Sequence, residues 1–280
     1  VSGLTLGKST NTATITLTAA TSVAGPVTMY GSGLTINENL ASSTGSNISL
    51  YGNTLTIGSG KTISSAGNLI IEPQTNGTTI GIAGGAGTLS LPATYFSSNF
   101  SNGFSEIRIG NSNAGHITHG AALTLQDPLQ LITGGNLILN ENIILGSNDF
   151  VFSGGTISPA TGKYIRSNGT GKLKMTIGNS ASKTFPIGTS YYNPVTITNN
   201  TGASDQFYAT VSDAVYSNGS TTGTQLLGAP RVDLTWNIGN TGASTGAGNV
   251  DLSFDWVPAN NVTGSFISPK LLHHNGTTWD

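Results

Sequence analysis

The stretch from Gly135 to Ser158, GNLILNENIILGSNDFVFSGGTIS, places three apolar triplets close together. They are LIL at 137–139, IIL at 143–145 and FVF at 150–152, and only three or four residues separate each from the next. Side chains alternate across a strand, so the outer two residues of a triplet face one way and the middle residue faces the other. Antiparallel hairpins this short would leave little backbone to pair. We therefore expect the three triplets to form three sides of one coil.

The same pattern recurs along the preceding chain, and its spacing predicts how the coils stack. Apolar residues repeat at steps of 20 or 21, as in Ile48 with Leu69, Leu69 with Leu89, Leu34 with Leu55, Leu123 with Ile143, and Leu129 with Phe150. A period near 20, with three short strands in each coil, predicts a right-handed parallel β-helix. The handedness follows from the general preference of parallel crossover connections. We expect Gly and Asn to make the corners, because both tolerate positive φ.

The rhythm changes beyond Gly178, where longer alternating strands are predicted at 195–198, 206–211, 231–238 and 249–257. Strands of this length and spacing are typical of a sandwich. We therefore predict an all-β chain with a parallel β-helix at 1–177 and a β-sandwich at 178–280, truncated at its C-terminus. Two strand faces are apolar enough that we expect them to be buried: Val232, Leu234, Trp236 and Ile238, and Val250, Leu252, Phe254 and Trp256.

The composition indicates a surface of hydroxyl and amide groups. Only 8% of the 280 residues are charged, the net charge is -2, and 39 residues are Gly. Ten scattered basic residues give no electrostatic footprint for nucleic acid. The absence of Cys excludes a disulfide framework. No apolar run reaches the roughly 18 residues of a membrane helix, and the start at Val1 suggests a mature piece or an internal fragment.

Three segments carry a family resemblance. TTIGIAGGAGTLSL (78–91) and GFSEIRIGNSNAGHITHGAALTLQDPLQLITGGNLIL (103–139) resemble the repeats of filamentous-haemagglutinin-like adhesins, large secreted β-helical proteins of Gram-negative bacteria. GTGKLKMTIGNSASKTFPIGTSYYNPVTITNNTG (169–202) is similar to a module of giant surface proteins of the Bacteroidota, many of them exported by the type IX route. The resemblance implies a secreted surface protein, and none of these segments has a catalytic motif.

An enzyme is the main alternative, because parallel β-helices also host polysaccharide lyases and hydrolases. Such sites need clustered carboxylates, often beside a basic residue. The best candidates are Glu106, Arg108 and Asp127, of which Glu106 and Arg108 both point outward from one strand. The competing interpretation is a solvated surface pair, which adds little stability.

Other motifs favour structural roles. His116 and His119 form H-x-x-H, but residues three apart on a strand face opposite sides, so a shared metal would require a bend. The pair at 273–274 has the same defect. The glycines of GIAGGAG (81–87) are followed by no Lys-Ser/Thr, so we expect tight corners rather than a phosphate loop.

Threonines and aromatics suggest two kinds of ligand surface. Ice binding uses ranks of outward Thr on one flat face, whereas Thr5, Thr16, Thr28, Thr35, Thr56 and Thr124 are expected on different sides. The segment at 92–103 is predicted to be a loop that leaves the coil, and its Tyr95 and Phe96 are candidate ligand contacts. Tyr191 and Tyr192 are the other candidates, although a plugging role competes for them.

These observations favour a non-enzymatic extracellular protein, part of a bacterial surface adhesin or filament stalk. We expect no catalytic residues, no metal and no cofactor. The expected partners are further domains of the same polypeptide or identical neighbouring chains, and surface glycans, with neither nucleic acid nor membrane insertion. The alternative is a carbohydrate-active β-helix enzyme or a glycan-binding module.

Overall fold

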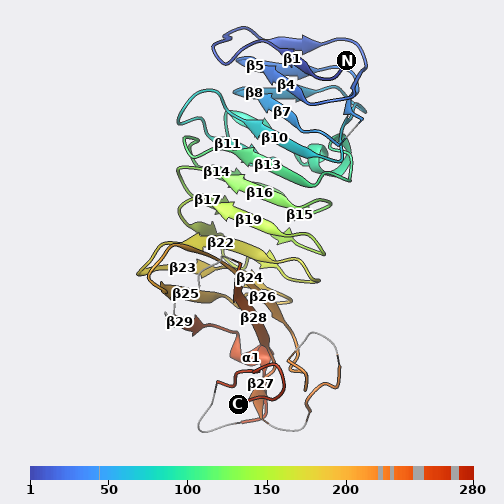
Figure 1. Ribbon diagram of the computed structural model, residues 1–280. Coiled ribbons are helices and arrows are strands. Elements are labelled where there is room, and N and C mark those ends of the chain that lie inside the picture. Colours follow the sequence, from blue (N-terminus) through green and yellow to red (C-terminus); the bar gives the residue numbers. More distant parts are fainter. Residues whose placement is uncertain (44, 220–222, 228–229, 242–248, 266–270) are drawn as a thin grey trace. The chain divides into compact units, whose positions relative to one another are not determined.

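The chain forms two compact units of β-structure. The computed structural model describes residues 1–43, 45–219, 223–227, 230–241, 249–265 and 271–280. Unit 1 is Val1–Lys163 and unit 2 is Tyr164–Asp280. Unit 1 is a parallel β-solenoid, whereas most strand pairs of unit 2 are antiparallel (Figure 1).

Three sides of the solenoid are built from short parallel strands. The first side is β1 (Leu4–Leu6), β4 (Val27–Tyr30), β7 (Ile48–Tyr51), β10 (Asn68–Glu72), β13 (Glu106–Gly110), β16 (Leu129–Ile132) and β19 (Phe150–Ser153). The second side has β2 (Ile15–Leu17), β5 (Gly33–Ile36) and β8 (Thr54–Ile57), then β12 (Leu89–Leu91), β11 (Ile80–Ile82), β14 (Ile117–His119), β17 (Leu137–Leu139) and β20 (Ile157–Pro159). The third side has β3 (Thr21–Val23), β6 (Leu40–Ser42) and β9 (Ile63–Ser64), and farther along the chain β15 (Leu123–Thr124) and β18 (Ile143–Ile144).

The outer residues of the triplets form continuous columns inside the first side. One column is Leu4, Val27, Ile48, Leu69, Ile107, Leu129 and Phe150, and its neighbour is Leu6, Met29, Leu50, Ile71, Ile109, Leu131 and Phe152. From the second coil onward these side chains are buried. Full burial of one such side chain contributes roughly 1.5–3 kcal/mol, so the stacked columns are the main source of stability.

Most of the predicted stacking pairs are confirmed, and one is wrong. Ile48 adjoins Leu69, Leu34 adjoins Leu55, Leu123 adjoins Ile143, and Leu129 adjoins Phe150. However, Leu69 adjoins Ile107, and Leu89 lies on the second side beside Ile80. The coil that starts at β10 is therefore much longer than its neighbours, and it contributes two strands, β11 and β12, to one side.

The glycines of GIAGGAG make this extra strand possible. β11 and β12 are parallel neighbours, so residues 83–88 must carry the chain back along the length of β11. A Cβ on Gly81 would lie 1.9 Å from the carbonyl oxygen of Gly85, and one on Gly87 would lie 2.2 Å from the nitrogen of Gly81. The return segment thus crosses directly over β11, which only residues without a side chain allow. These glycines allow a chain reversal across a strand, rather than the simple corner that we predicted.

Asparagine serves the corners by hydrogen bonding rather than by positive φ. Among the described residues, the non-glycine residues with positive φ are Ala83 and Ser180. Corner Oδ1 atoms instead accept hydrogen bonds from backbone N–H groups one coil farther on: Asn39 from Thr62, Asn47 from Asn68, Asn53 from Gln74, and Asn136 from Thr156, each at 3.0 Å. The Nδ1 atom of His116 fills the same role for the N–H group of Asn136 at 2.9 Å.

The segment at 92–103 does not leave the coil. It contains η1 (Tyr95–Asn99), a short π-helix, followed by Phe100, which bridges to Ile63 of β9 in parallel. The hydroxyl group of Tyr95 accepts a hydrogen bond from the Ile57 N–H group at 2.9 Å and donates one to the Leu55 carbonyl at 3.2 Å. The segment therefore continues the third side of the solenoid, and its aromatic side chains fill the interior.

Unit 2 contains two antiparallel three-stranded sheets and smaller pairings. Within this unit, one sheet has the order β22 (Leu173–Ile177), β26 (Asp205–Ser212) and β28 (Thr235–Asn240), and the other has the order β23 (Ala181–Phe185), β25 (Val195–Asn200) and β29 (Asn249–Phe254). The remaining elements are β21 (Ile165–Arg166), β24 (Ile187–Gly188), β27 (Arg231–Val232), α1 (Pro258–Asn261) and β30 (Val262–Thr263). The pair β21–β24 is parallel and the pair β27–β30 is antiparallel.

The predicted apolar faces of unit 2 are only partly buried. Leu234 is buried, and the Trp236 ring lies 4.8 Å from the Phe254 ring. In contrast, Val250 and Leu252 are 39% and 38% exposed. They lie on β29, which is the last strand in the order of its sheet, so strand pairing shields it on one side only. The prediction that this face is fully buried is wrong.

Candidate functional site

The three residues proposed for an acid–base cluster have different surroundings. Glu106 and Arg108 occupy outward positions of β13, where Arg108 lies between Ile70 and Gln130 in register. Asp127 precedes β16, is buried, and its Oδ1 atom accepts a hydrogen bond from the Gly103 N–H group at 2.8 Å. Burial raises the pKa of Asp127, while the N–H groups of Gly103 and Phe104 oppose the rise. Asp127 thus holds the end of the 92–103 segment against the corner before β16.

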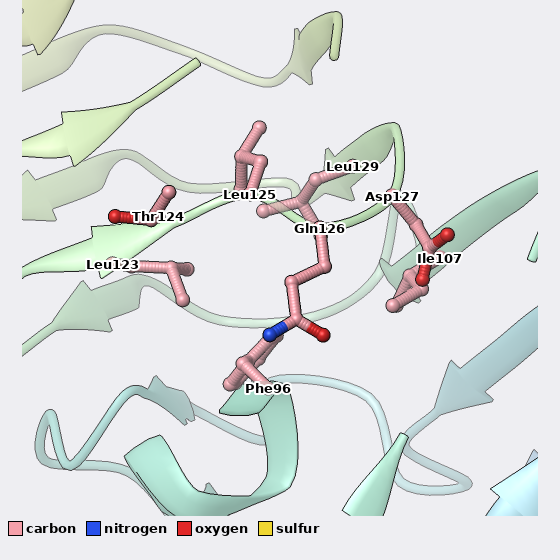
Figure 2. Close-up of a pocket in the computed structure, with 8 residues that line it drawn as sticks. All are labelled: Phe96, Ile107, Leu123, Thr124, Leu125, Gln126, Asp127 and Leu129. Atoms are coloured by element: carbon pink, nitrogen blue, oxygen red, sulfur yellow. The ribbon is translucent and has the colours of Figure 1, made fainter. Parts of the chain in front are cut away.

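A small pocket lies beside Asp127 in unit 1. Its volume is about 10 Å³, which is room for about one water molecule. Figure 2 shows its lining, with the side chain of Gln126 extending toward Phe96 of η1. The lining includes Asp127 and Ile107 but neither Glu106 nor Arg108. This pocket is too small to enclose a sugar ring.

The histidines of H-x-x-H face opposite sides, as the strand alternation predicts. His116 is exposed at the corner before β14. His119 is buried in the interior, where it lies between Ile82 and Leu139 in register. Burial lowers the pKa of His119 to about 4, although the backbone and carboxylate of Glu141 oppose the change. At neutral pH it is therefore an uncharged core residue.

The four aromatic residues proposed as ligand contacts differ in exposure. Tyr95 and Phe96 are 6% and 7% exposed, so they offer no surface to a ligand. Tyr191 is 42% exposed, whereas Tyr192 is half-buried and its ring lies 6.4 Å from that of Tyr164. Burial raises the pKa of Tyr192. Of the four, Tyr191 is the one whose side chain is largely accessible.

Part of the threonine pattern forms a rank, contrary to our expectation. Thr16, Thr35 and Thr56 occupy successive coils of the second side, in register and in outward positions. Thr5 and Thr28 are adjacent on the first side. The sequence does not show these threonines at one regular spacing, because the corner before β2 is longer than the corner before β5. The rank of Thr16, Thr35 and Thr56 lies on one sheet of three strands.

A larger pocket lies in unit 2 and was not predicted. Its volume is about 210 Å³, and it is lined by Gly169, Thr170, Lys172, Thr210, Ser212, Gly219, Thr235 and Asn237. In register, Thr210 lies opposite Asn237 and Ser212 lies opposite Thr235. In the sequence these residues resemble the solvated positions of ordinary strands. The signal that could have found them is the cross-strand pairing, which spacing alone does not give.

No protein-family model, curated protein or solved structure matches the chain. Within the described ranges, no group of three or more His, Asp or Glu side chains is arranged to hold a metal ion. The same ranges include no helix with the length and apolar character needed to cross a membrane.

Proposed function

We propose that the chain is a non-enzymatic structural and adhesive part of an extracellular bacterial surface protein, an adhesin or a filament stalk. In this proposal the solenoid of unit 1 is right-handed and serves as a shaft. The two antiparallel sheets of unit 2 form a β-sandwich. Contacts with surface glycans are weak singly and gain from repetition along an assembly.

The arrangement of the first side is the observation that supports this proposal best. Its interior is filled by two aliphatic and aromatic columns, while its outward positions include Thr5, Thr28, Ser49 and Gln130. Stacked coils of this kind bury their inward residues only against each other, which suits an extended scaffold. The resemblance of residues 78–91 and 103–139 to β-helical adhesin repeats points the same way.

A paired adhesion and hydrolysis assay tests the proposal. Beads densely coated with the chain should be retained on glycan-coated surfaces, and sparsely coated beads should wash off, because avidity requires several contacts. The same protein should release no reducing ends from a panel of polysaccharides. Release that disappears in Glu106→Gln or Asp127→Asn, but persists in the matched variant Gln130→Ala, would overturn the non-enzymatic function. Equal retention of beads at both densities would contradict the multivalent mechanism.

Ice binding is a second candidate, favoured by the rank of Thr16, Thr35 and Thr56. Strands pair at about 4.8 Å, so the rank presents hydroxyl and methyl groups at a regular spacing. If the rank binds ice, the chain should separate the melting and freezing points of a solution. Thr35→Lys should abolish the effect, and Thr124→Lys on the third side should preserve it. No separation of the two temperatures at millimolar protein would exclude this candidate.

A further inference from the structure

The larger pocket lies on the outward face of the sheet β22, β26 and β28. The opposite face of this sheet is core, because Leu173, Met175 and Ile177 of β22, and Phe207, Ala209 and Val211 of β26, are buried. Thr210 and Ser212 alternate with the buried residues of β26 and therefore face outward. Their register partners on β28 are Asn237 and Thr235. Half of the lining thus lies on paired strands, and the other half, Gly169, Thr170, Lys172 and Gly219, lies outside them.

The side chains that line the pocket are polar or absent. Four hydroxyl groups come from Thr170, Thr210, Ser212 and Thr235, an amide comes from Asn237, and an ammonium group comes from Lys172. The hydroxyl group of Thr235 donates to the Ala214 carbonyl at 2.7 Å, which leaves its lone pairs as acceptors. An apolar ligand would remove water from these groups without replacing their hydrogen bonds, at considerable cost. The lining therefore selects a ligand with many donors and acceptors.

The charge of this face is positive. The Nζ atom of Lys172 lies 3.9 Å from the centre of the Tyr208 ring, which is a cation–π contact. Tyr208 lies opposite Gly239, and a Cβ at Gly239 would be 2.5 Å from the Tyr208 hydroxyl oxygen, so the ring fills the space above this glycine. The outward residues of β26 and β28 include no acid; they are Gln206, Tyr208, Thr210, Ser212, Thr235, Asn237 and Gly239. A carboxylate on the ligand would therefore meet an attractive charge.

We propose that this pocket binds one acidic sugar residue, a uronic acid. The carboxylate pairs with Lys172, and the ring hydroxyl groups bond to Thr210, Thr235 and Asn237. A volume of about 210 Å³ is roughly twenty times that of the pocket beside Asp127, which has room for about one water molecule, so this pocket has room for one sugar ring. The inference deepens the adhesive part of the proposed function and rests on it for its biological role, whereas binding can be measured independently.

Titration of the isotope-labelled full chain with glucuronic acid, followed by backbone amide shifts, tests the inference. The amides of Thr210, Ser212 and Thr235 should shift saturably. Glucose, which lacks the carboxylate, should bind about tenfold more weakly, and Lys172→Gln should weaken glucuronic acid binding by about tenfold. Lys174→Gln is the matched control, since it removes a nearby lysine of β22 that lies outside the lining, and it should change the affinity less than twofold.

Three results would overturn the inference. They are the absence of saturable shifts in these amides, equal affinity for glucose and glucuronic acid, and equal affinity for inorganic phosphate, which would indicate a simple anion site. Thr210→Val, which replaces one outward hydroxyl group with a methyl group, should weaken binding. The amide signals of this variant should stay as dispersed as those of the wild type, because the fold is retained. If the chain hydrolyses polysaccharides but still binds glucuronic acid saturably, the proposed function is refuted and this site is not. If the chain fails to bind glucuronic acid but adheres in a density-dependent way, this site is refuted and the proposed function is not.

Discussion

At the scale of single residues, His119 is the clearest conflict between a side chain and its surroundings. It occupies a column position between Ile82 and Leu139, and it is fully buried. The pKa of its imidazole falls from 6.5 to about 4 in the folded chain because burial penalises the charged form. The unfolded chain therefore binds a proton below about pH 6.5, and the folded chain does so only below about pH 4. Stability should be lost as pH falls through this window.

The first prediction concerns His119→Leu. This variant cannot titrate and matches its aliphatic neighbours, so its free energy of unfolding should exceed that of the wild type by an amount that grows as pH falls. Between pH 6.5 and 4 the added difference should reach about 3 kcal/mol, since one pKa unit corresponds to about 1.4 kcal/mol. Urea unfolding at pH 7, 5 and 4 measures it. The control Thr118→Ala should show the same dependence of stability on pH as the wild type. If the stability of His119→Leu also ran parallel to that of the wild type across this pH range, the lowered pKa of His119 would be refuted.

At the scale of elements, the triplets could be predicted from the sequence, but the long coil could not. LIL at 137–139, IIL at 143–145 and FVF at 150–152 lie on three successive sides, as predicted. Alternation within a triplet is local, so it appears in the sequence directly. The position of Leu89 depends instead on how residues 83–88 cross over β11, which is a tertiary event. In the sequence, the glycines at 81, 85 and 87 that allow this crossing look the same as the glycines of an ordinary turn.

The candidate sites, too, could be predicted from the sequence only in part. The opposite orientation of His116 and His119 followed from strand alternation, and the structure confirms it. The pocket of unit 2 depends on the antiparallel register that sets Thr210 beside Asn237, and register is a property of two distant segments. The sequence pattern indicates a loop at Tyr95, and it does not reveal that the hydrogen-bonding partners of the Tyr95 hydroxyl group lie about forty positions earlier in the chain.

At the scale of the whole molecule, the first coil exposes both backbone and side chains. β1, β2 and β3 each stand first in the order of their sheets, so one edge of each has no partner strand among the described residues. Leu4, Leu6 and Ile15 are only half-buried, whereas the column partners of the two leucines, Val27 and Met29, are fully buried. Unpaired parallel edges above an apolar interior are templates for pairing with another chain.

We therefore predict that the purified chain associates with itself through the edge of its first coil, and that Leu6→Lys prevents this. A lysine that points inward on an edge strand places a charge where a second chain would have to bury it, which blocks pairing. Sedimentation velocity over a range of protein concentrations should show growing species for the wild type and a monomer for Leu6→Lys, with unchanged circular dichroism. Ser158→Lys adds the same charge at an exposed outward position of β20 and should associate as the wild type does. A wild-type chain that stays monomeric at high concentration, or association that survives Leu6→Lys, would refute the proposed role of this edge.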